Sequence, residues 1–315
     1  MKRIHVGLLA WLLLIALPLW GCRPAQPAQA AGGAPIQAVD MMGRSLSLDA
    51  PATRVVALAA ADCEILYALG AGDALVGRGE YCDYPAAAQS VPKVQSGYDT
   101  NLEQLLTLEP QVVFMSVMAQ PKEQVDALES AGIRVVSINA QDLEGVYEAI
   151  GLIGTVMGRD AEAAALVADM QADFADLARQ AAAQPGGKSV YFETSPLEWG
   201  LWTAGKGTFM EELAALLNLT NVFNDLEGWA EVSQEQVIER DPAYIVTLAM
   251  AGDNEASPVA EILGRPGWEN LRAIRDGNVF RLDSDALTRP GPRLVEGARA
   301  LYDFVYGGRA APGTP

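Results

Sequence analysis

The feature that most constrains this fold is a double alternation of strand-like and helix-like segments. The two alternating stretches are separated by residues 143–184, which carry almost no strand signal. Short apolar runs such as RVVALA (54–59) and SVYFE (189–193) are typical of buried strands, and helical patterns follow them. This alternation predicts an α/β protein with two Rossmann-like βα lobes on parallel sheets. No glycine-rich phosphate loop follows the first strand, so a dinucleotide site is not expected.

Between the lobes the sequence predicts two helices, at residues 142–158 and 159–184. Apolar residues recur at spacings of three or four in the second helix, which indicates one buried stripe; they are Leu166, Met170, Phe174 and Leu177. About 23 residues at about 1.5 Å each span on the order of 35 Å, enough to run along both lobes. We expect Asp160 to cap this bridging helix.

The patterns divide the chain into six segments. We expect a signal peptide (1–22), a flexible tether (23–52), an N-terminal lobe (53–145), a helical linker (146–186), a C-terminal lobe (187–309) and a tail (310–315). The tether is rich in Pro, Ala, Gly and Gln, a composition that favours a flexible chain.

The first 22 residues have a basic start followed by an apolar run, which is typical of a secretory signal. The apolar run is shorter than the roughly 20 residues of a membrane span. The final Leu-Trp-Gly-Cys resembles a bacterial lipoprotein signal, which implies lipidation of Cys22 and an extracytoplasmic, membrane-anchored protein. The alternative is an ordinary cleaved signal in which Cys22 is incidental.

The net charge and the residue usage exclude several classes of function. The formal net charge is −18, which disfavours binding to nucleic acid or to an anionic membrane surface. The single histidine is His5, within the signal, so the commonest metal ligand and general base is missing from the mature chain. Cys63 and Cys82 remain after Cys22; a disulfide and two buried thiols are both open for them.

One short device occurs twice. NLEQLLTLEP (101–110) and SQEQVIERDP (233–242) each carry a potential cap, a Glu-Gln pair, aliphatic residues, an acid and a proline before a strand-like run. Glu103 and Glu235 occupy the matching position, in the first turn of each expected helix. We interpret the two runs as equivalent points of the two lobes. A simpler reading is that each glutamate only offsets its helix dipole.

These segments resemble the substrate-binding proteins of ABC importers for cobalamin and ferric siderophores. The similarity is carried by RVVALAAADCEILYALGAGDALVGRGEYCDYP (54–85), NLEQLLTLEPQVVF (101–114) and RPGPRLVEG (289–297), and the cobalamin-binding members are the most similar. The resemblance implies a class III periplasmic binding protein fold, with two lobes bridged by a long helix and ligand held between them. It also implies a monomer without enzymatic activity or cofactor.

The resemblance assigns a docking role to Glu103 and Glu235, which would bind basic pockets of an ABC permease. The cytoplasmic ATPase would then be an indirect partner, through the permease. It assigns aromatic ligand contacts to Tyr81, Trp202 and Trp229. Each of these rings could instead be a core or loop residue.

The chain departs from the cobalamin binders at two places. Ser116 replaces a tryptophan after the third strand, and the SGYD segment replaces another, so that Tyr98 is the candidate substitute. Asp285 and Arg289 match an acid–base pair that contacts ligand in the family. Arg289 could equally pair with an anionic siderophore, or the two could form a local surface pair, while Arg293 is expected to anchor the last helix.

The expected function is therefore capture of cobalamin or a related corrinoid for an ABC importer. A ferric siderophore or haem is the alternative cargo, with Arg78 among its candidate contacts. An extracytoplasmic hydrolase using Glu193 and Glu198 is a third reading, and a free-metal receptor is disfavoured by the lack of histidine. We expect no bound metal.

Overall fold

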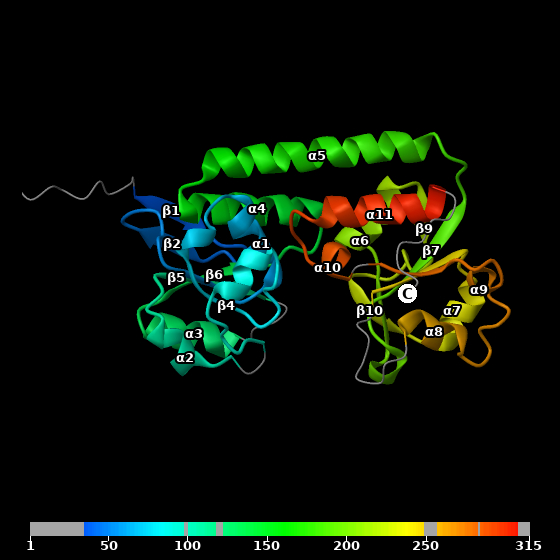
Figure 1. Ribbon diagram of the computed structural model, residues 1–315, viewed down its shortest axis with the longest axis horizontal. Helices are drawn as coiled ribbons and strands as arrows, with labels where there is room; N and C mark the ends of the chain where they lie inside the picture. The colour runs from blue at the N-terminus through cyan, green and yellow to red at the C-terminus, as the bar shows by residue number, and fades with distance from the viewer. Residues whose placement is uncertain (1–34, 98–99, 118–121, 249–256, 283, 308–315) are drawn as a thin grey trace, which may run out of the picture. The chain divides into compact units, whose positions relative to one another are not determined.

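The computed structural model describes residues 35–97, 100–117, 122–248, 257–282 and 284–307 (Figure 1). All of them belong to one compact unit, residues 33–315. The expected signal peptide, Cys22 and Tyr98 lie outside the described residues.

The N-terminal lobe is built on a four-stranded parallel sheet. Its strands are β3 (Val55–Ala57), β4 (Leu75–Arg78), β5 (Val112–Ser116) and β6 (Arg134–Ile138), in the order β4-β3-β5-β6. Its helices are α1 (Ala60–Ala68), α2 (Leu102–Thr107) and α3 (Lys122–Ser130), with single turns at Gly72–Ala74 and Ala86–Ser90. Apolar residues dominate β3 and β5, whose residues are buried almost throughout, as expected for a sheet covered on both faces.

The C-terminal lobe repeats this arrangement. Its parallel strands are β7 (Lys188–Glu193), β9 (Leu219–Asn221), β11 (Tyr244–Thr247) and β12 (Val279–Arg281), in the order β12-β11-β7-β9. Its helices are α6 (Phe209–Leu216), α7 (Gln234–Arg240), α8 (Pro258–Leu263) and α9 (Arg272–Arg275). Counted along the chain, both sheets have the strand order second, first, third, fourth. In both lobes a helix carrying the repeated device, α2 or α7, directly precedes the third strand.

Helices join the two sheets. α4 (Leu143–Met157) begins at Asp142, whose Oδ1 accepts a hydrogen bond from the Gly145 amide, and ends at Gly158 with φ 64°. α5 (Asp160–Ala182) runs beside both α4 and α11 (Leu294–Tyr306), as Figure 1 shows. The short α10 (Ser284–Thr288) precedes α11. The predicted class III fold, with two βα lobes and a long bridging helix, is confirmed.

Two details of the bridging helix test the sequence pattern. Met170, Phe174 and Leu177 are buried and Leu166 is partly buried, in line with the predicted stripe. The cap assignment is wrong, because Arg159 occupies the cap position of α5. Asp160 instead accepts a hydrogen bond from the Thr155 hydroxyl at the end of α4.

A hairpin lies where the sequence predicted only a tether. β1 (Ile36–Val39) and β2 (Ser45–Leu48) pair antiparallel, so the prediction of a flexible segment over 23–52 is wrong for these residues. The buried Asp40 carboxylate accepts hydrogen bonds from the Arg44 guanidinium at 2.7 Å and from the Ser137 amide of β6 at 3.1 Å. Burial opposes ionisation, but these hydrogen bonds lower the pKa of Asp40. Tertiary contacts therefore order a segment whose composition favours flexibility.

A second antiparallel pair was also not predicted. β8 (Leu201–Ala204) pairs with β10 (Trp229–Val232), next to a turn at Leu197–Trp199. Each strand has only four residues, too few for a reliable alternation signal.

Candidate ligand-binding cleft

A cavity of about 760 Å³ lies where the strands of both parallel sheets end. The N-terminal lobe contributes Leu58 after β3, Ser116 at the end of β5 and the Tyr81–Asp83 region after β4, whereas the C-terminal lobe contributes Thr194 after β7 and Leu248 after β11. We call this cavity the main cleft. The carboxyl ends of parallel strands are the usual ligand position in such sheets, since the connecting loops leave a crevice there.

Two exposed aromatic rings border the main cleft. Tyr81 is 64% exposed and Trp199 is 65% exposed, which leaves most of each large apolar ring open to solvent. The turn that carries Trp199 is held by the Ser195 hydroxyl, which donates to the Gly200 carbonyl at 2.6 Å and accepts from the Trp202 amide at 3.0 Å. The structure thus places the predicted Tyr81 in the cleft and adds Trp199, which the sequence comparison missed.

The other predicted rings lie elsewhere. Neither Trp202 nor Trp229 is among the described residues that line the main cleft. Trp202 is on β8 and is 41% exposed. The Trp229 indole donates to the Gln141 side chain at 3.2 Å and packs edge-on against Phe209, with ring centroids 5.5 Å apart. Ligand contact by Trp202, Trp229 and the undescribed Tyr98 stays a prediction.

The predicted Asp285–Arg289 pair is present, and two further acids join it. The Arg289 guanidinium lies 2.9 Å from Asp285, 2.9 Å from Glu64 and 2.8 Å from Asp83. Burial opposes its ionisation, but the hydrogen bonds to Asp83 and Glu64 raise the pKa of Arg289. Partial burial of Asp83 is likewise outweighed by Arg289, which lowers the pKa of that carboxyl. The positive charge of Arg289 is therefore already matched within the protein.

Glu64 also connects α1 to the segment before α11. Its carboxylate accepts from Arg293 Nε and Nη2, both at 3.0 Å, while the Arg293 guanidinium lies 4.2 Å from the centre of the Tyr84 ring. Arg293 thus anchors the start of α11, as expected. Glu64 was not predicted, although an acidic residue within the apolar run of α1 is itself a signal of a buried partner.

The two repeated helices have matching starts. Asn101 Oδ1 accepts from the Gln104 amide at 2.9 Å, and Ser233 Oγ accepts from the Gln236 amide at 3.3 Å. Glu103 and Glu235 follow at equivalent positions with exposed side chains. Hydrogen bonds from its own backbone amide and from Ser233 lower the pKa of Glu235. Both carboxylates are therefore accessible on the surface.

The helix ends match as well. Glu109 after α2 and Asp241 after α7 have φ values of 47° and 40°, in the left-handed region, and each precedes a proline. α2 and α7 each lead into a parallel strand. Their N-termini therefore lie on the side of the sheet where the strands end, which is the side that borders the main cleft.

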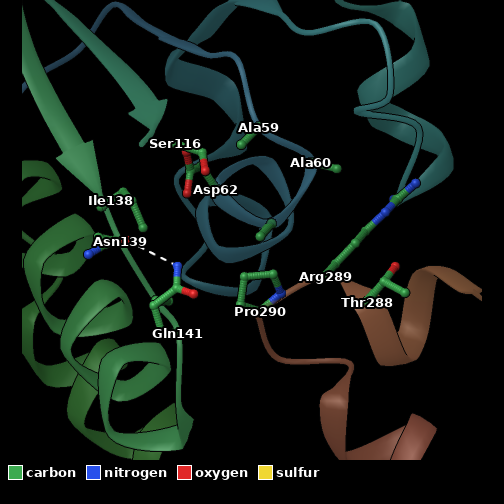
Figure 2. A pocket seen from close by; sticks show the side chains of 12 residues that line it. Ala59, Ala60, Asp62, Ser116, Ile138, Asn139, Gln141, Thr288, Arg289 and Pro290 are labelled. Carbon is green, nitrogen blue, oxygen red and sulfur yellow. Dashed lines mark hydrogen bonds between the residues drawn. The ribbon is translucent and has the colours of Figure 1, made fainter. Parts of the chain in front are cut away.

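A smaller pocket of about 140 Å³ adjoins the main cleft (Figure 2). We call it the side pocket. Both cavities share Ala59, Ala60, Ser116, Thr288 and Arg289, and the side pocket adds Asp62, Asn139, Gln141 and Pro290 among others. Ser116, where the family resemblance predicts a tryptophan, leaves this space open.

The residues of the hydrolase reading are not available for catalysis as a pair. Glu193 is buried, and both its carboxylate oxygens accept hydrogen bonds from Arg265, at 2.6 and 2.9 Å. Within the described ranges, no group of three or more His, Cys, Asp or Glu side chains could hold a metal ion. Cys63 and Cys82 are both buried free thiols.

Two parallel βα lobes, a bridging helix and a cleft at the strand ends define a two-lobed solute-binding protein. The chain belongs to the periplasmic binding protein family, whose model matches residues 55–286.

The similar proteins are binding proteins whose names differ in the ligand. The uncharacterized ABC transporter substrate-binding lipoprotein YvrC of Bacillus subtilis is 31% identical over 96% of this chain and 97% of its own. A cobalamin-binding protein of Halobacterium salinarum is 28% identical, over 93% and 83% respectively. The solved structure of a periplasmic heme binding protein from Pseudomonas aeruginosa is 26% identical, with a TM-score of 0.73 over 84% of this chain and 96% of that one.

The family settles the class of activity. The chain is an extracytoplasmic substrate-binding protein that works with ABC transporter components on a small-molecule ligand, and it is not an enzyme. None of the helices in the described part of the chain is both long and apolar enough to cross a bilayer.

Proposed function

We propose that this protein captures cobalamin or a related corrinoid in the main cleft and delivers it to an ABC permease. The observation that carries the proposal is the charge balance at the cleft. Arg289 lines the cleft with a side chain that is only 10% exposed. Its positive charge is matched by Glu64, Asp83 and Asp285. A cleft without unmatched positive charge at this point favours a cargo of low net charge over a polyanionic ferric complex.

The remaining lining suits a broad ring with amide edges. Tyr81 and Trp199 offer exposed aromatic faces. Ser96 and Ser116 offer hydroxyl groups to amides, and Thr194 Oγ1, which donates to the Trp202 carbonyl at 3.0 Å, can still accept. A corrin presents an apolar ring face and polar amides around its rim, which fits this combination.

A ferric siderophore or haem is the second candidate. Arg281 lies in the cleft lining with an exposed side chain, and the Tyr81 phenol is equally accessible. An arginine can pair with a carboxylate or catecholate, and tyrosine is one of the residues that bind haem iron.

Calorimetric titration of the purified protein with cyanocobalamin tests the cargo. We expect one-to-one binding that weakens about tenfold in Trp199→Ala and in Tyr81→Ala, since each loses a stacking surface. Leu263→Ala is the control, because that side chain is exposed but lies outside the cleft lining. No binding of cyanocobalamin, together with tight binding of a ferric hydroxamate, a ferric catecholate or haemin, would reject the corrinoid assignment in favour of the second candidate.

Delivery is proposed to use Glu103 and Glu235 as contacts for basic pockets on the permease, one from each lobe. Their equivalent positions and exposure support this role. The double variant Glu103→Ala/Glu235→Ala should reduce cargo uptake by cells at least tenfold while leaving cargo affinity unchanged. Glu239→Ala, also exposed on α7, is the control. Wild-type uptake by the double variant would exclude docking through these residues.

Anchoring through a lipidated Cys22 completes the proposal. The Leu-Trp-Gly-Cys sequence and the naming of the Bacillus relative as a lipoprotein support it. Cys22→Ser should release the protein from the membrane fraction.

A further inference from the structure

Asp62 is a buried acid that forms none of the contacts described above. It lies in the first turn of α1 and is only 1% exposed. Its Oδ2 has no hydrogen-bond partner, although buried polar atoms are nearly always paired. The residue also lines the side pocket, and Figure 2 shows its side chain there together with Ser116 and Gln141.

The side pocket is small, partly apolar and rich in neutral polar groups. Ala59, Ile138 and Pro290 form apolar walls. The Gln141 side chain donates to Asn139 at 3.0 Å and accepts from Trp229 at 3.2 Å, so its orientation is fixed. A volume of about 140 Å³ has room for about four or five water-sized groups.

The chemistry of Asp62 limits what can enter. Burial raises the pKa of Asp62 to about 7, so the neutral acid is well populated near neutral pH. A neutral carboxylic acid offers one donor and one acceptor side by side, which is the complement of a primary amide. The Arg289 guanidinium that lines the same pocket is already matched by three acids, so the pocket offers no unmatched positive charge to an anion and a neutral polar group is favoured.

We propose that the side pocket binds a primary carboxamide arm of the cargo, with the Asp62 hydroxyl donating to the amide oxygen and the other Asp62 oxygen accepting from the amide nitrogen. The inference rests on the proposed corrinoid function, since corrinoids carry such arms around the ring. An arm of about four non-hydrogen atoms fills the pocket. Asp62 then acts as a specificity residue that distinguishes amide arms from acids and esters, because an unmatched buried polar group is costly.

The test compares Asp62→Asn with Asp62→Leu. Asparagine keeps one donor and one acceptor at the same place, whereas leucine has neither. At a pH below the pKa of Asp62, calorimetry should show that Asp62→Asn binds cyanocobalamin within about threefold of wild type. Asp62→Leu should bind about tenfold more weakly, the equivalent of one or two net hydrogen bonds. A corrinoid whose arms are methyl esters can accept from Asp62 but cannot donate to it, so the ratio between the wild-type and Asp62→Leu affinities should be smaller than for cyanocobalamin.

Two controls separate this inference from misfolding and from the identity of the cargo. Asp169→Leu, on the exposed face of α5, and thermal melting of every variant control for folding. Propionamide serves as a probe independent of corrinoids: it should shift NMR signals of the side pocket in wild type and Asp62→Asn, but not in Asp62→Leu.

The outcomes are distinguishable. Wild-type cobalamin affinity in Asp62→Leu, or equal losses in the asparagine and leucine variants, overturns the amide assignment and leaves the proposed function standing. A protein that ignores cyanocobalamin but shows the propionamide pattern keeps the amide pocket and loses the corrinoid cargo. A protein that responds to neither probe overturns both.

Discussion

The two lobes share a strand order, but the buried carboxyl group near the first strand is hydrogen-bonded to an arginine in only one of them. In the C-terminal lobe Glu193, at the end of β7, is held by both nitrogens of the Arg265 fork. In the N-terminal lobe Asp62, shortly after β3, has an oxygen without a partner. A paired carboxylate is part of the scaffold, whereas an unpaired one beside a pocket is available to a ligand. The comparison therefore separates structural from binding acids where burial alone does not.

The strongest way to break this comparison is to remove the paired carboxylate. Glu193→Ala leaves the Arg265 charge buried, with Glu261 as its remaining acid, and should lower the free energy of unfolding by about 3–5 kcal/mol. Urea denaturation followed by circular dichroism measures it. Asp62→Asn, the counterpart in the other lobe, should not lower the free energy of unfolding at neutral pH. Equal losses for the two variants would show that the two carboxyls play the same role.

The pH dependence of stability sharpens the comparison. Asp62 has a folded-state pKa of about 7, well above the ordinary aspartate value of 3.8, because it is buried. The folded state therefore binds the Asp62 proton more tightly than the unfolded state does. The resulting contribution to the free energy of unfolding is fully present below the unfolded-state pKa and is lost as the pH rises toward 7. Each pKa unit is worth roughly 1.4 kcal/mol, so the decline should reach a few kcal/mol. Unfolding measured across this pH range should show a shallower decline in Asp62→Asn; an unchanged slope would contradict the role of Asp62.

The smallest expected effect concerns the repeated helices. Gln104 of α2 accepts from the Gln95 amide at 3.2 Å and donates to the Lys93 carbonyl at 2.6 Å, whereas Gln236 of α7 closes a capping box with Ser233. Gln104→Ala should therefore cost about 1–2 kcal/mol and Gln236→Ala about 0.5–1 kcal/mol. Thermal melts of both variants measure the difference. The reverse order would mean that the capping box matters more than the tertiary contacts.

Local pattern was sufficient for most strands of the two parallel sheets and for the bridging helix, but not for the three-residue β9, which carries no strand signal. Apolar runs and a stripe spaced by three or four carry their own signal, because burial dictates periodicity. The repeated device was also readable, since caps, prolines and glutamates stand at fixed offsets. Its structural equivalence follows from the shared strand order.

The rest of the site depends on contacts between distant segments. Glu64 and Arg289 are 225 residues apart, and although an acid in an apolar run signals a buried partner, the local pattern does not say which residue that partner is. The sequence predicted a ligand contact at Trp202 and none at Trp199. Which of these two nearby rings faces the cleft depends on how a turn and a short strand orient them. The hairpin at residues 36–48 is held by Asp40, whose partners are Arg44 in the hairpin turn and Ser137 on the distant strand β6.

That hairpin has a mechanical consequence. The chain before Ile36 enters the folded unit through β1, which is paired with β2 and pinned through Asp40 to Arg44 and Ser137. A pull on the N-terminal end is therefore borne first by the outer strand β6, on the sheet edge opposite β4. β6 ends at Ile138, which lines the side pocket together with the following Asn139, so the hairpin and the side pocket share one supporting strand and a pull on the hairpin is transmitted to the wall of that pocket.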